Sequence, residues 1–260
     1  MKTTDRTLGR AMDLVQTGLS TALLLTLLFL LGLMSLGWNL LAALLYPLLS
    51  RERGLVLGRS AISRCYRWFW TLARLTGMLK LESQALERFR DEPGLIIVAN
   101  HPSMLDALML VARLPRSACI MKAALMKNAF LGPGARLARY IRNDSPRSMI
   151  RLAVQDLQRG GQLVIFPEGT RTTRRPINPF GSGVTLIAKL ADAPIQAVFI
   201  DTVSPYLGKG WPLWRLPPLP IVFTVRAGER FAPSPDPHAL LRQLEQYFAA
   251  GMKPPTTAAG

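Results

Sequence analysis

An uncharged run of 37 residues, Leu14 to Ser50, restricts the fold of this chain more than any other feature. It is rich in Leu and longer than the ~20 apolar residues that a membrane-spanning helix needs. A secretory signal has an apolar core of only ~7–15 residues, followed by a small-residue cleavage site, and neither feature fits this run. The run therefore predicts a membrane-inserted segment, to which we assign residues 1–54.

The length of the run means that the segment must bend or tilt in a membrane. One straight helix of 37 residues would be roughly 55 Å long, whereas the hydrocarbon core of a bilayer is ~30 Å thick. Positive charge flanks both ends, at Lys2, Arg6 and Arg10 and again from Arg51 to Arg67. Because cytoplasmic flanks are enriched in Lys and Arg, this favours a re-entrant helical hairpin with both flanks cytoplasmic. A single tilted span with only its C-terminal flank inside is the alternative.

Residues 55–81 have the pattern of an amphipathic helix. Basic and apolar side chains fall on opposite faces, with Arg59, Arg67 and Arg74 on one and Ile62, Cys65, Phe69 and Leu72 on the other. Basic residues interleaved with aromatic ones suit the headgroup level of an anionic membrane, so we expect an interfacial helix. The alternative is a helix that packs on a soluble domain and keeps its arginines in water.

The overall charge also indicates an anionic partner. Lys and Arg total 32 against 16 acidic residues, a formal net charge of +16. Phospholipid headgroups and nucleic acid both attract such a chain. Since 49% of the residues are hydrophobic and no helix-turn-helix, zinc-finger or RNA-binding signature is present, we expect an anionic membrane surface and no nucleic acid.

From residue 82 to residue 250, short β-type runs alternate with helical segments, which predicts one α/β domain. The expected strands are 95–99, 118–121, 163–166, 195–200 and 221–225, and the expected helices are 103–114, 134–140, 145–159, 183–190 and 235–250. The predicted fold is a central, mostly parallel or mixed sheet flanked by helices and preceded by a membrane helix or helical hairpin. Residues 202–220 are rich in Pro and Trp and predict an irregular loop, and residues 251–260 predict a disordered tail.

One of the two histidines lies beside a carboxylate at the end of a predicted strand. It is the second residue of Asn100-His101-Pro102-Ser103-Met104-Leu105-Asp106. Pro102 suits the first position of a helix, so we expect His101 to be the N-cap and to fold its ring back toward Asp106. The carboxylate would fix one ring nitrogen as the N–H and leave the other as a general base, worth ~10²–10⁴ in rate. The alternative is a helix cap and a surface aspartate.

A second polar cluster, Phe166-Pro167-Glu168-Gly169-Thr170-Arg171, ends another predicted strand. Arg171 can bind a phosphate bidentately, and Gly169 lets a ligand approach the main chain. Glu168 can receive a hydroxyl or hold Arg171 in position. A turn stabilised by an internal Glu168–Arg171 pair is the alternative to a ligand site.

Together these motifs resemble the glycerolipid acyltransferase family of the lysophosphatidic acid acyltransferase type. Its first block, Asn-His-x4-Asp, and its third, Phe-Pro-Glu-Gly-Thr-Arg, are complete here, and its fourth matches Ala193-Pro194-Ile195. The resemblance covers roughly residues 79–225. It implies that His101 deprotonates an acceptor hydroxyl with Asp106 as its partner. It also implies a substrate-binding set of Asn100, Glu168, Gly169, Thr170 and Arg171.

The resemblance further implies a thioester donor, acyl-CoA or acyl carrier protein, with no other cofactor, no metal and no covalent enzyme intermediate. In agreement, no Ser or Cys constellation stands beside a base, and Cys65 and Cys119 lack metal-ligand spacing. The implied protein is a membrane-bound O-acyltransferase on the cytoplasmic face, of the inner membrane if bacterial. Its acceptor would be a lysophospholipid such as 1-acyl-glycerol-3-phosphate, giving phosphatidic acid.

The second block of the family is where this chain departs. The usual Lys-x-Glu-Leu reads Lys122-Ala123-Ala124-Leu125 here, followed by Gly134 and Arg142. Lys122, Lys127 and Arg142 are candidates for binding the acceptor or the anionic groups of the donor, unless they are merely solvated. The departure keeps a specialised acceptor open, such as a lyso-ornithine lipid or a polyketide-like head group. A catalytically silent lipid-binding membrane scaffold is the rival from another class, although it would have no use for the His101/Asp106 pair.

Overall fold

The computed structural model describes residues 2–174 and 176–252, with side chains from residue 12 onward, so the predicted tail lies almost wholly outside the described residues. Helix α1 (Lys2–Leu45) is continuous, and the chain reverses only after it, before α2 (Arg51–Leu75). The prediction of a hairpin within the apolar run is therefore wrong. Gly32 and Gly37 lie inside the unbroken helix, whereas Pro47, which cannot continue a helical hydrogen-bond ladder, lies in the turn that follows it.

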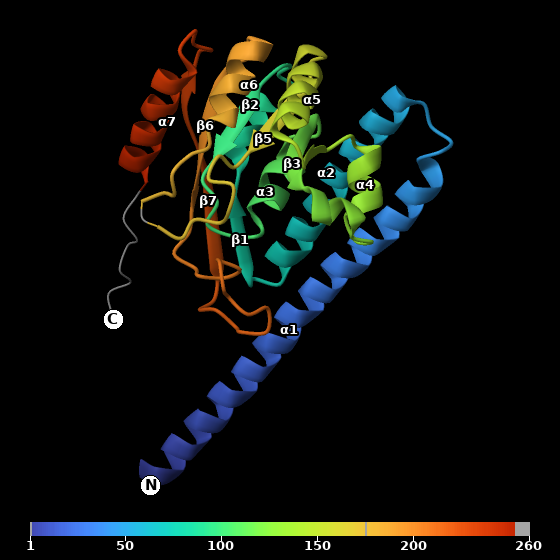
Figure 1. The fold of residues 1–260 in the computed structure, drawn as a ribbon. Coiled ribbons are helices and arrows are strands. Elements are labelled where there is room, and N and C mark those ends of the chain that lie inside the picture. The colour runs from blue at the N-terminus through green and yellow to red at the C-terminus, as the bar shows by residue number, and fades with distance from the viewer. Residues whose placement is uncertain (1, 175, 253–260) are drawn as a thin grey trace.

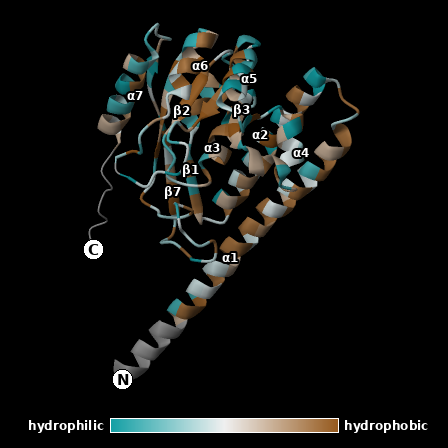
Figure 2. Ribbon diagram, viewed as in Figure 1, coloured by the Kyte–Doolittle hydropathy of each residue, from teal (hydrophilic) through white to brown (hydrophobic). Residues whose placement is uncertain are grey.

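Helix α1 packs on the domain with its C-terminal half and projects from it with its N-terminal half (Figure 1). Leu24, Leu27 and Ala42 are buried, whereas Leu14 and Leu19 are at least 70% exposed. Figure 2 shows that the exposed helix is largely apolar. Residues Met12–Leu45, with a mean hydropathy of 2.3, are long and apolar enough to cross a membrane.

Seven strands form one sheet in the order β1-β7-β6-β2-β5-β3-β4. Strands β2 to β6 run parallel to one another, β7 is antiparallel to β6, and β1 is parallel to β7, which confirms the mixed sheet. The bounds are β1 Leu79–Glu82, β2 Ile96–Ala99, β3 Ser117–Lys122, β4 Ile141–Asn143, β5 Gln162–Ile165, β6 Ile195–Asp201 and β7 Ile221–Phe231. All five predicted strands are present. The short edge strands β1 and β4 were not predicted, because half or more of their residues are polar.

Helices cover both faces of the sheet (Figure 1). Side chains alternate along β2, so that Ile97 and Ala99 join the cluster beneath α2 and α3, while Ile96 and Val98 join the cluster beneath α5, α6 and α7. The remaining helices are α3 Asp106–Arg113, α4 Gly132–Leu137, α5 Pro146–Gln158, α6 Gly183–Ala191 and α7 Pro237–Gly251, with 3₁₀ turns η1 Gln84–Phe89 and η2 Ala123–Lys127. Because β2 and β5 are adjacent and parallel, the motifs that follow them lie side by side.

Helix α2 packs into the domain, as the alternative prediction holds, but its arginine face is not uniformly in water. Arg59 is only 3% exposed and pairs with Asp156 at 2.8 Å. Its guanidinium also donates to the carbonyls of Ala138 (3.1 Å) and Arg116 (2.8 Å). Arg59 therefore ties α2 to the domain and is not available to a membrane surface.

Gly58 marks a close approach of α2 to the segment after α4. A Cβ at Gly58 would lie 2.7 Å from the backbone nitrogen of Ala138, a distance that requires the backbone to shift. We predict that Gly58→Ala lowers the free energy of unfolding by about 1–3 kcal/mol. The matched control is Gly37→Ala in α1, where a Cβ meets nothing within 4 Å and where Ala should be neutral or stabilising by up to about 1 kcal/mol. Denaturation in detergent compares the variants, and equal effects would contradict the contact.

Candidate active site

His101 lies in the loop that joins β2 to α3, where it contacts a buried carboxylate. Its Nδ1 is 2.9 Å from Oδ2 of Asp106. The Asp106 side chain is fully buried and the His101 side chain is 19% exposed. Since Nδ1 is used by the carboxylate, Nε2 is the ring nitrogen left to act on a substrate. The ring of Phe166 stacks on the imidazole, with ring centroids 4.2 Å apart, and limits its orientation.

The local structure that brings the pair together differs from the prediction. Helix α3 begins at Asp106, so Pro102 is not its first residue and His101 is not its N-cap. Residues 102–105 form a turn in which Ser103 N–H donates to Asp106 Oδ2 at 2.7 Å and Asp106 N–H donates to the Ser103 carbonyl at 3.3 Å. An aspartate side chain that captures a nearby backbone N–H competes with helix formation. The predicted contact is present, but a turn makes it.

Burial controls the ionisation of Asp106. Its pKa is raised to about 6, because burial disfavours the carboxylate more than the His101 ring and the Ser103 N–H favour it. Oδ1 is also buried and has no hydrogen-bond partner among the residues that the structure describes. Near neutral pH the carboxylate is ionised and can hold the proton of the imidazole on Nδ1.

Asn100 joins the end of β2 to β6 and is not available to a substrate. Its Nδ2 donates to the Ile200 carbonyl at 2.9 Å, and its Oδ1 accepts from the Ile200 N–H at 2.8 Å. The side chain is fully buried. The prediction that Asn100 binds substrate is therefore wrong, because backbone groups of β6 already occupy its donor and its acceptor.

Replacing Asn100 tests this positioning role. Asn100→Ala leaves the N–H and C=O of Ile200 unpaired in the core, and we expect it to lower the free energy of unfolding by about 2–4 kcal/mol. Asn100→Asp keeps an acceptor for the N–H but places a buried carboxylate against the Ile200 carbonyl, so it should lose at least as much. Chemical denaturation measures both, and a loss below about 0.5 kcal/mol for the alanine variant would show that the amide is dispensable.

The Glu168 carboxylate joins the two motif loops. It accepts hydrogen bonds from the His101 N–H (3.1 Å), the Thr172 hydroxyl (2.7 Å) and the Asn178 N–H (2.9 Å). A further bond runs from the Thr172 N–H to the His101 carbonyl at 2.7 Å. Glu168 is 8% exposed. These bonds hold the backbone of His101, and the predicted contact of Glu168 with an acceptor stays a prediction.

Arg171 lies on the same turn but does not pair with Glu168. Its Nη1 donates to the carbonyls of Leu207 (2.9 Å) and Gly208 (3.0 Å). Within residues 2–174 and 176–252, no ion pair involves Arg171. Beside it, Thr170 is half-buried and Gly169 is exposed, with a φ of +65° that favours glycine. The turn thus presents a guanidinium and exposed backbone at the carboxyl ends of the parallel strands, where His101 also lies.

The basic residues of the second block lie at the same end of the sheet, beyond β5. Strands β3 and β4 are the second and third from β2, so their ends lie about 10 and 14 Å from the end of β2 at the usual strand spacing. Lys122 and Lys127 are exposed. Arg142, which faces Met121 in the strand pairing, is 58% exposed and pairs with Asp144 at 3.2 Å. The fold places these residues on the same edge without bringing them into contact with His101.

Sequence reasoning missed Phe166, Thr172 and Asn178 as parts of the site. A motif gives residue types along the chain, whereas these contacts join distant segments. The bond from His101 to Glu168 spans 67 residues, and the bond from Ser103 to Tyr206 spans 103. The signal in the sequence was that both motifs follow predicted strands of a mostly parallel sheet, and the pairing of β2 with β5 brings them together.

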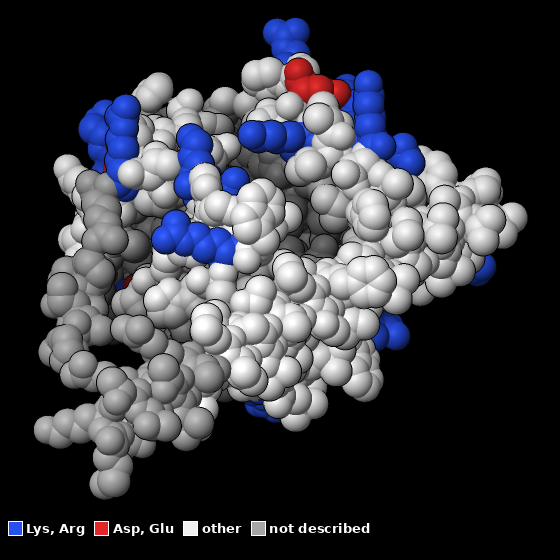
Figure 3. All heavy atoms as spheres, turned by 90° about the horizontal axis from the view of Figure 1, so that it is seen from below, with Lys and Arg blue, Asp and Glu red and all other residues white. Residues whose placement is uncertain are grey.

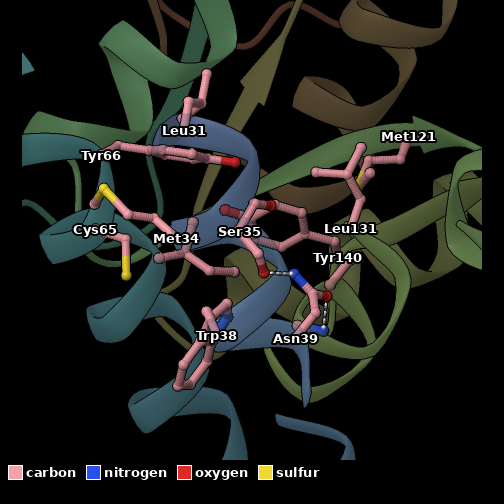
Figure 4. A pocket seen from close by; sticks show the side chains of 13 residues that line it. Leu31, Met34, Ser35, Trp38, Asn39, Cys65, Tyr66, Met121, Leu131 and Tyr140 are labelled. Atoms are coloured by element: carbon pink, nitrogen blue, oxygen red, sulfur yellow. Dashed lines mark hydrogen bonds between the residues drawn. The ribbon is translucent and has the colours of Figure 1, made fainter. Parts of the chain in front are cut away.

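A small cavity lies near the same edge, between α1, α2 and α4 (Figure 4). It has a volume of about 60 Å³ and a mostly apolar lining that includes Leu31 and Met34 of α1, Tyr66 of α2 and Met121 of β3. In the described part of the chain, neither Trp38 Nε1 nor the Tyr140 hydroxyl has a hydrogen-bond partner. Met121 is the residue of β3 that lines the cavity.

Comparisons with known proteins agree on one family. Residues 80–201 match the Acyltransferase family. A 1-acyl-sn-glycerol-3-phosphate acyltransferase of Pseudomonas aeruginosa is 25% identical over 183 residues, which are 67% of this chain and 68% of that protein. A lyso-ornithine lipid O-acyltransferase of the same bacterium is 33% identical over 152 residues, which are 54% and 58% of the two chains.

The fold has a solved counterpart in the 1-acyl-sn-glycerophosphate (LPA) acyltransferase PlsC of Thermotoga maritima. The TM-score is 0.66 at 20% identity, over 90% of this chain and 95% of that one, and a likeness at this identity concerns the fold alone. The matched stretch spans about half the length of most curated relatives, between 46% and 68%. The family match contains both motif loops. Residues 80–201 therefore match the Acyltransferase family, and the chain is similar to glycerolipid acyltransferases of the lysophosphatidic acid acyltransferase type.

Proposed function

We propose that this protein is a membrane-associated O-acyltransferase. It transfers a fatty acyl chain from acyl-CoA or acyl carrier protein to the free hydroxyl of a lysophospholipid, with 1-acyl-glycerol-3-phosphate as the first candidate acceptor. The observation that carries the proposal is the bond of 2.9 Å between His101 Nδ1 and the buried carboxylate of Asp106. The relatives named as 1-acyl-sn-glycerol-3-phosphate acyltransferases support the acceptor.

In the proposed reaction, Nε2 of His101 takes the proton of the acceptor hydroxyl while the oxygen attacks the thioester carbonyl. Asp106 holds Nδ1 protonated and stabilises the imidazolium that forms. The C–O bond is then complete and the C–S bond breaks, and the imidazolium returns the proton to the leaving thiolate. The sequence of steps needs no covalent enzyme intermediate and no cofactor besides the acyl donor.

Arg171 is proposed to bind the acceptor phosphate. One of its nitrogens is held by two carbonyls, which orients the planar guanidinium and leaves it without a carboxylate partner among the described residues. Gly169 and Thr170 would let the acceptor approach the turn. Lys122 and Arg142, about 10 and 14 Å along the edge by strand spacing, would meet the anionic groups of a donor.

Membrane association is proposed through α1, whose projecting half has apolar side chains that are exposed. The half of α1 that packs on the domain cannot be surrounded by lipid, so the helix would lie partly in the bilayer and partly on the protein. The catalytic domain and the basic end of α2 would then face the cytoplasm. The acyl chain would pack near the apolar cavity between α1, α2 and α4.

A second acceptor class is a lyso-ornithine lipid. It is favoured by the relative of that name, which is 33% identical over 152 residues. The replacement of the family glutamate by Ala124 also favours altered head-group contacts. A silent lipid-binding scaffold is disfavoured, because burying Asp106 against His101 raises the free energy of the ionised carboxylate and serves no purpose in a protein without a base.

A panel of acceptors tests the proposed function. Purified protein in detergent is given a labelled acyl thioester, as acyl-CoA or acyl carrier protein, with lysophosphatidic acid, lyso-ornithine lipid or a neutral lysophospholipid. Esterified product with an anionic acceptor is the expected result. If Arg171 binds the phosphate, Arg171→Ala should raise the KM for lysophosphatidic acid more than that for the lyso-ornithine lipid. Absence of transfer to every acceptor from both donors would overturn the proposal.

A further inference from the structure

The loop of residues 202–220, between β6 and β7, exposes large apolar side chains at the end of the molecule where it lies beside α1 (Figure 1). Trp214 is 74% exposed, Val203 68%, Leu213 48% and Leu219 38%. Two basic residues, Lys209 and Arg215, are also exposed. The loop contains no acidic residue. Exposed apolar residues of this size are not explained by packing within the chain.

The inner side of the loop is firmly held. Tyr206 and Leu207 are 1% exposed and belong to the core cluster that also contains Leu24 and Leu27 of α1. Trp211 packs against the same cluster. The exposed residues of the loop are therefore presented from a fixed base beside the membrane helix.

The chemistry of the exposed side is that of a membrane interface. Trp side chains concentrate at the headgroup level, and Lys and Arg without neighbouring acids are attracted to anionic lipids. The guanidinium of Arg215 lies 4.6 Å from the ring centroid of Trp211, so charge and aromatic surface are presented together. Seen from below, this end of the molecule is hollowed in its middle, with Lys and Arg on one side and a broad uncharged surface on the other (Figure 3).

We propose that the loop of residues 202–220 is a second membrane contact, which inserts Trp214 and Leu213 into the headgroup region of an anionic bilayer beside α1. The proposal rests on the proposed function for the presence of a membrane. It adds a site outside the apolar N-terminal run and states which lipid chemistry it meets: anionic headgroups for Lys209 and Arg215, and the acyl boundary for Trp214.

The base of this loop also holds the active site. The carbonyls of Leu207 and Gly208 accept from Arg171, and the Leu207 carbonyl also accepts the Met104 N–H at 3.0 Å. The Tyr206 carbonyl accepts the Ser103 hydroxyl at 3.1 Å. The loop that contacts lipid is thus bonded to the turn between His101 and Asp106. Binding of the loop to the bilayer would place the active site next to the leaflet that supplies the acceptor.

Fluorescence quenching tests the contact without reference to activity. Full-length protein is reconstituted with vesicles of phosphatidylglycerol and phosphatidylethanolamine, with and without brominated acyl chains. The emission of wild type minus that of Trp214→Phe isolates Trp214. We expect this difference to be strongly quenched by the brominated lipids, and a difference that the bromine leaves unchanged would overturn the proposal.

An activity measurement then tests the consequence. The double variant Leu213→Ser, Trp214→Ala should turn over vesicle-borne acceptor about tenfold more slowly than wild type, since interfacial apolar area is lost. It should use a short-chain, water-soluble acceptor within about twofold of wild type. The matched control, Leu190→Ser, alters a side chain of α6 that is 51% exposed and should change neither rate. Equal losses on both acceptors would contradict docking. A wild type inactive on every acceptor would refute the proposed function and leave the quenching result standing.

Discussion

Asp106→Asn should lower kcat for acyl transfer by about 10²–10⁴-fold, although it alters no group that touches the substrate. His101 Nδ1 and the Ser103 N–H both bond Oδ2 of Asp106, so Asn can place only its NH₂ or its oxygen there. With the NH₂ there, it donates to Nδ1 and holds the ring proton on Nε2, the nitrogen that must act as the base. With the oxygen there, the imidazolium that forms has no negative charge beside it. Steady-state transfer from a labelled thioester measures the loss. A variant with more than a tenth of wild-type kcat would contradict the proposed role of the carboxylate.

The same substitution should stabilise the folded protein at pH 7. The pKa of Asp106 is raised from 3.8 to about 6, so the folded state binds this proton more tightly than the unfolded state does. The stabilisation from protonated Asp106 is complete below about pH 4 and is lost as the pH rises through about 6. We expect Asp106→Asn to gain about 1–3 kcal/mol at pH 7 and to flatten the pH dependence of stability between about 4 and 6. Denaturation at several pH values checks both, and a large destabilisation at pH 7 would contradict the energetic argument.

Glu168→Ala should lower the rate of transfer by about 10²-fold and destabilise the fold, for a different reason. It removes the acceptor of the backbone N–H groups of His101 and Asn178, as well as that of the Thr172 hydroxyl. Because buried donors are left unpaired, we expect the free energy of unfolding to fall by about 3 kcal/mol. Released from Glu168, the His101 backbone no longer holds the ring in position, and even small displacements of a catalytic group cost about 10²-fold in rate.

Two controls separate this effect from a general loss of charge. Glu168→Gln keeps an acceptor and should retain part of the stability, whereas Glu229→Ala removes an exposed carboxylate and should change neither rate nor stability. Full activity of Glu168→Ala in folded protein would show that the carboxylate does not position His101.

The sheet could be predicted because its central strands are nearly continuous apolar runs. The residues of β2, Ile96–Ala99, are all buried, and an apolar run of this kind predicts a strand without information on the strands beside it. The pairing of His101 with Asp106 could also be predicted, since both are close in sequence. Their local structure could not, because Pro102 suits a turn as well as a helix start, and the side chain of Asp106 decides between them.

The remaining differences concern partners distant in sequence. In the sequence, Arg59 falls on the same helical face as Arg67 and Arg74, so its burial could not be predicted. In the structure its guanidinium binds Asp156 and two backbone carbonyls from distant segments. Asn100 and Glu168 have side chains suited to binding a substrate, but in the structure they form hydrogen bonds with backbone groups of other segments. The hairpin prediction failed because glycines weaken a helix only modestly, so Gly32 and Gly37 did not break α1.

His101→Ala gives the most direct test of general-base catalysis. Purified variant and wild type, matched for folding by circular dichroism, are given labelled acyl thioester and the acceptor that the wild type uses best. We predict transfer reduced by at least about 10³-fold in the variant, with partial recovery when free imidazole is supplied. Turnover by His101→Ala within tenfold of wild type would contradict the assignment of His101 as the base.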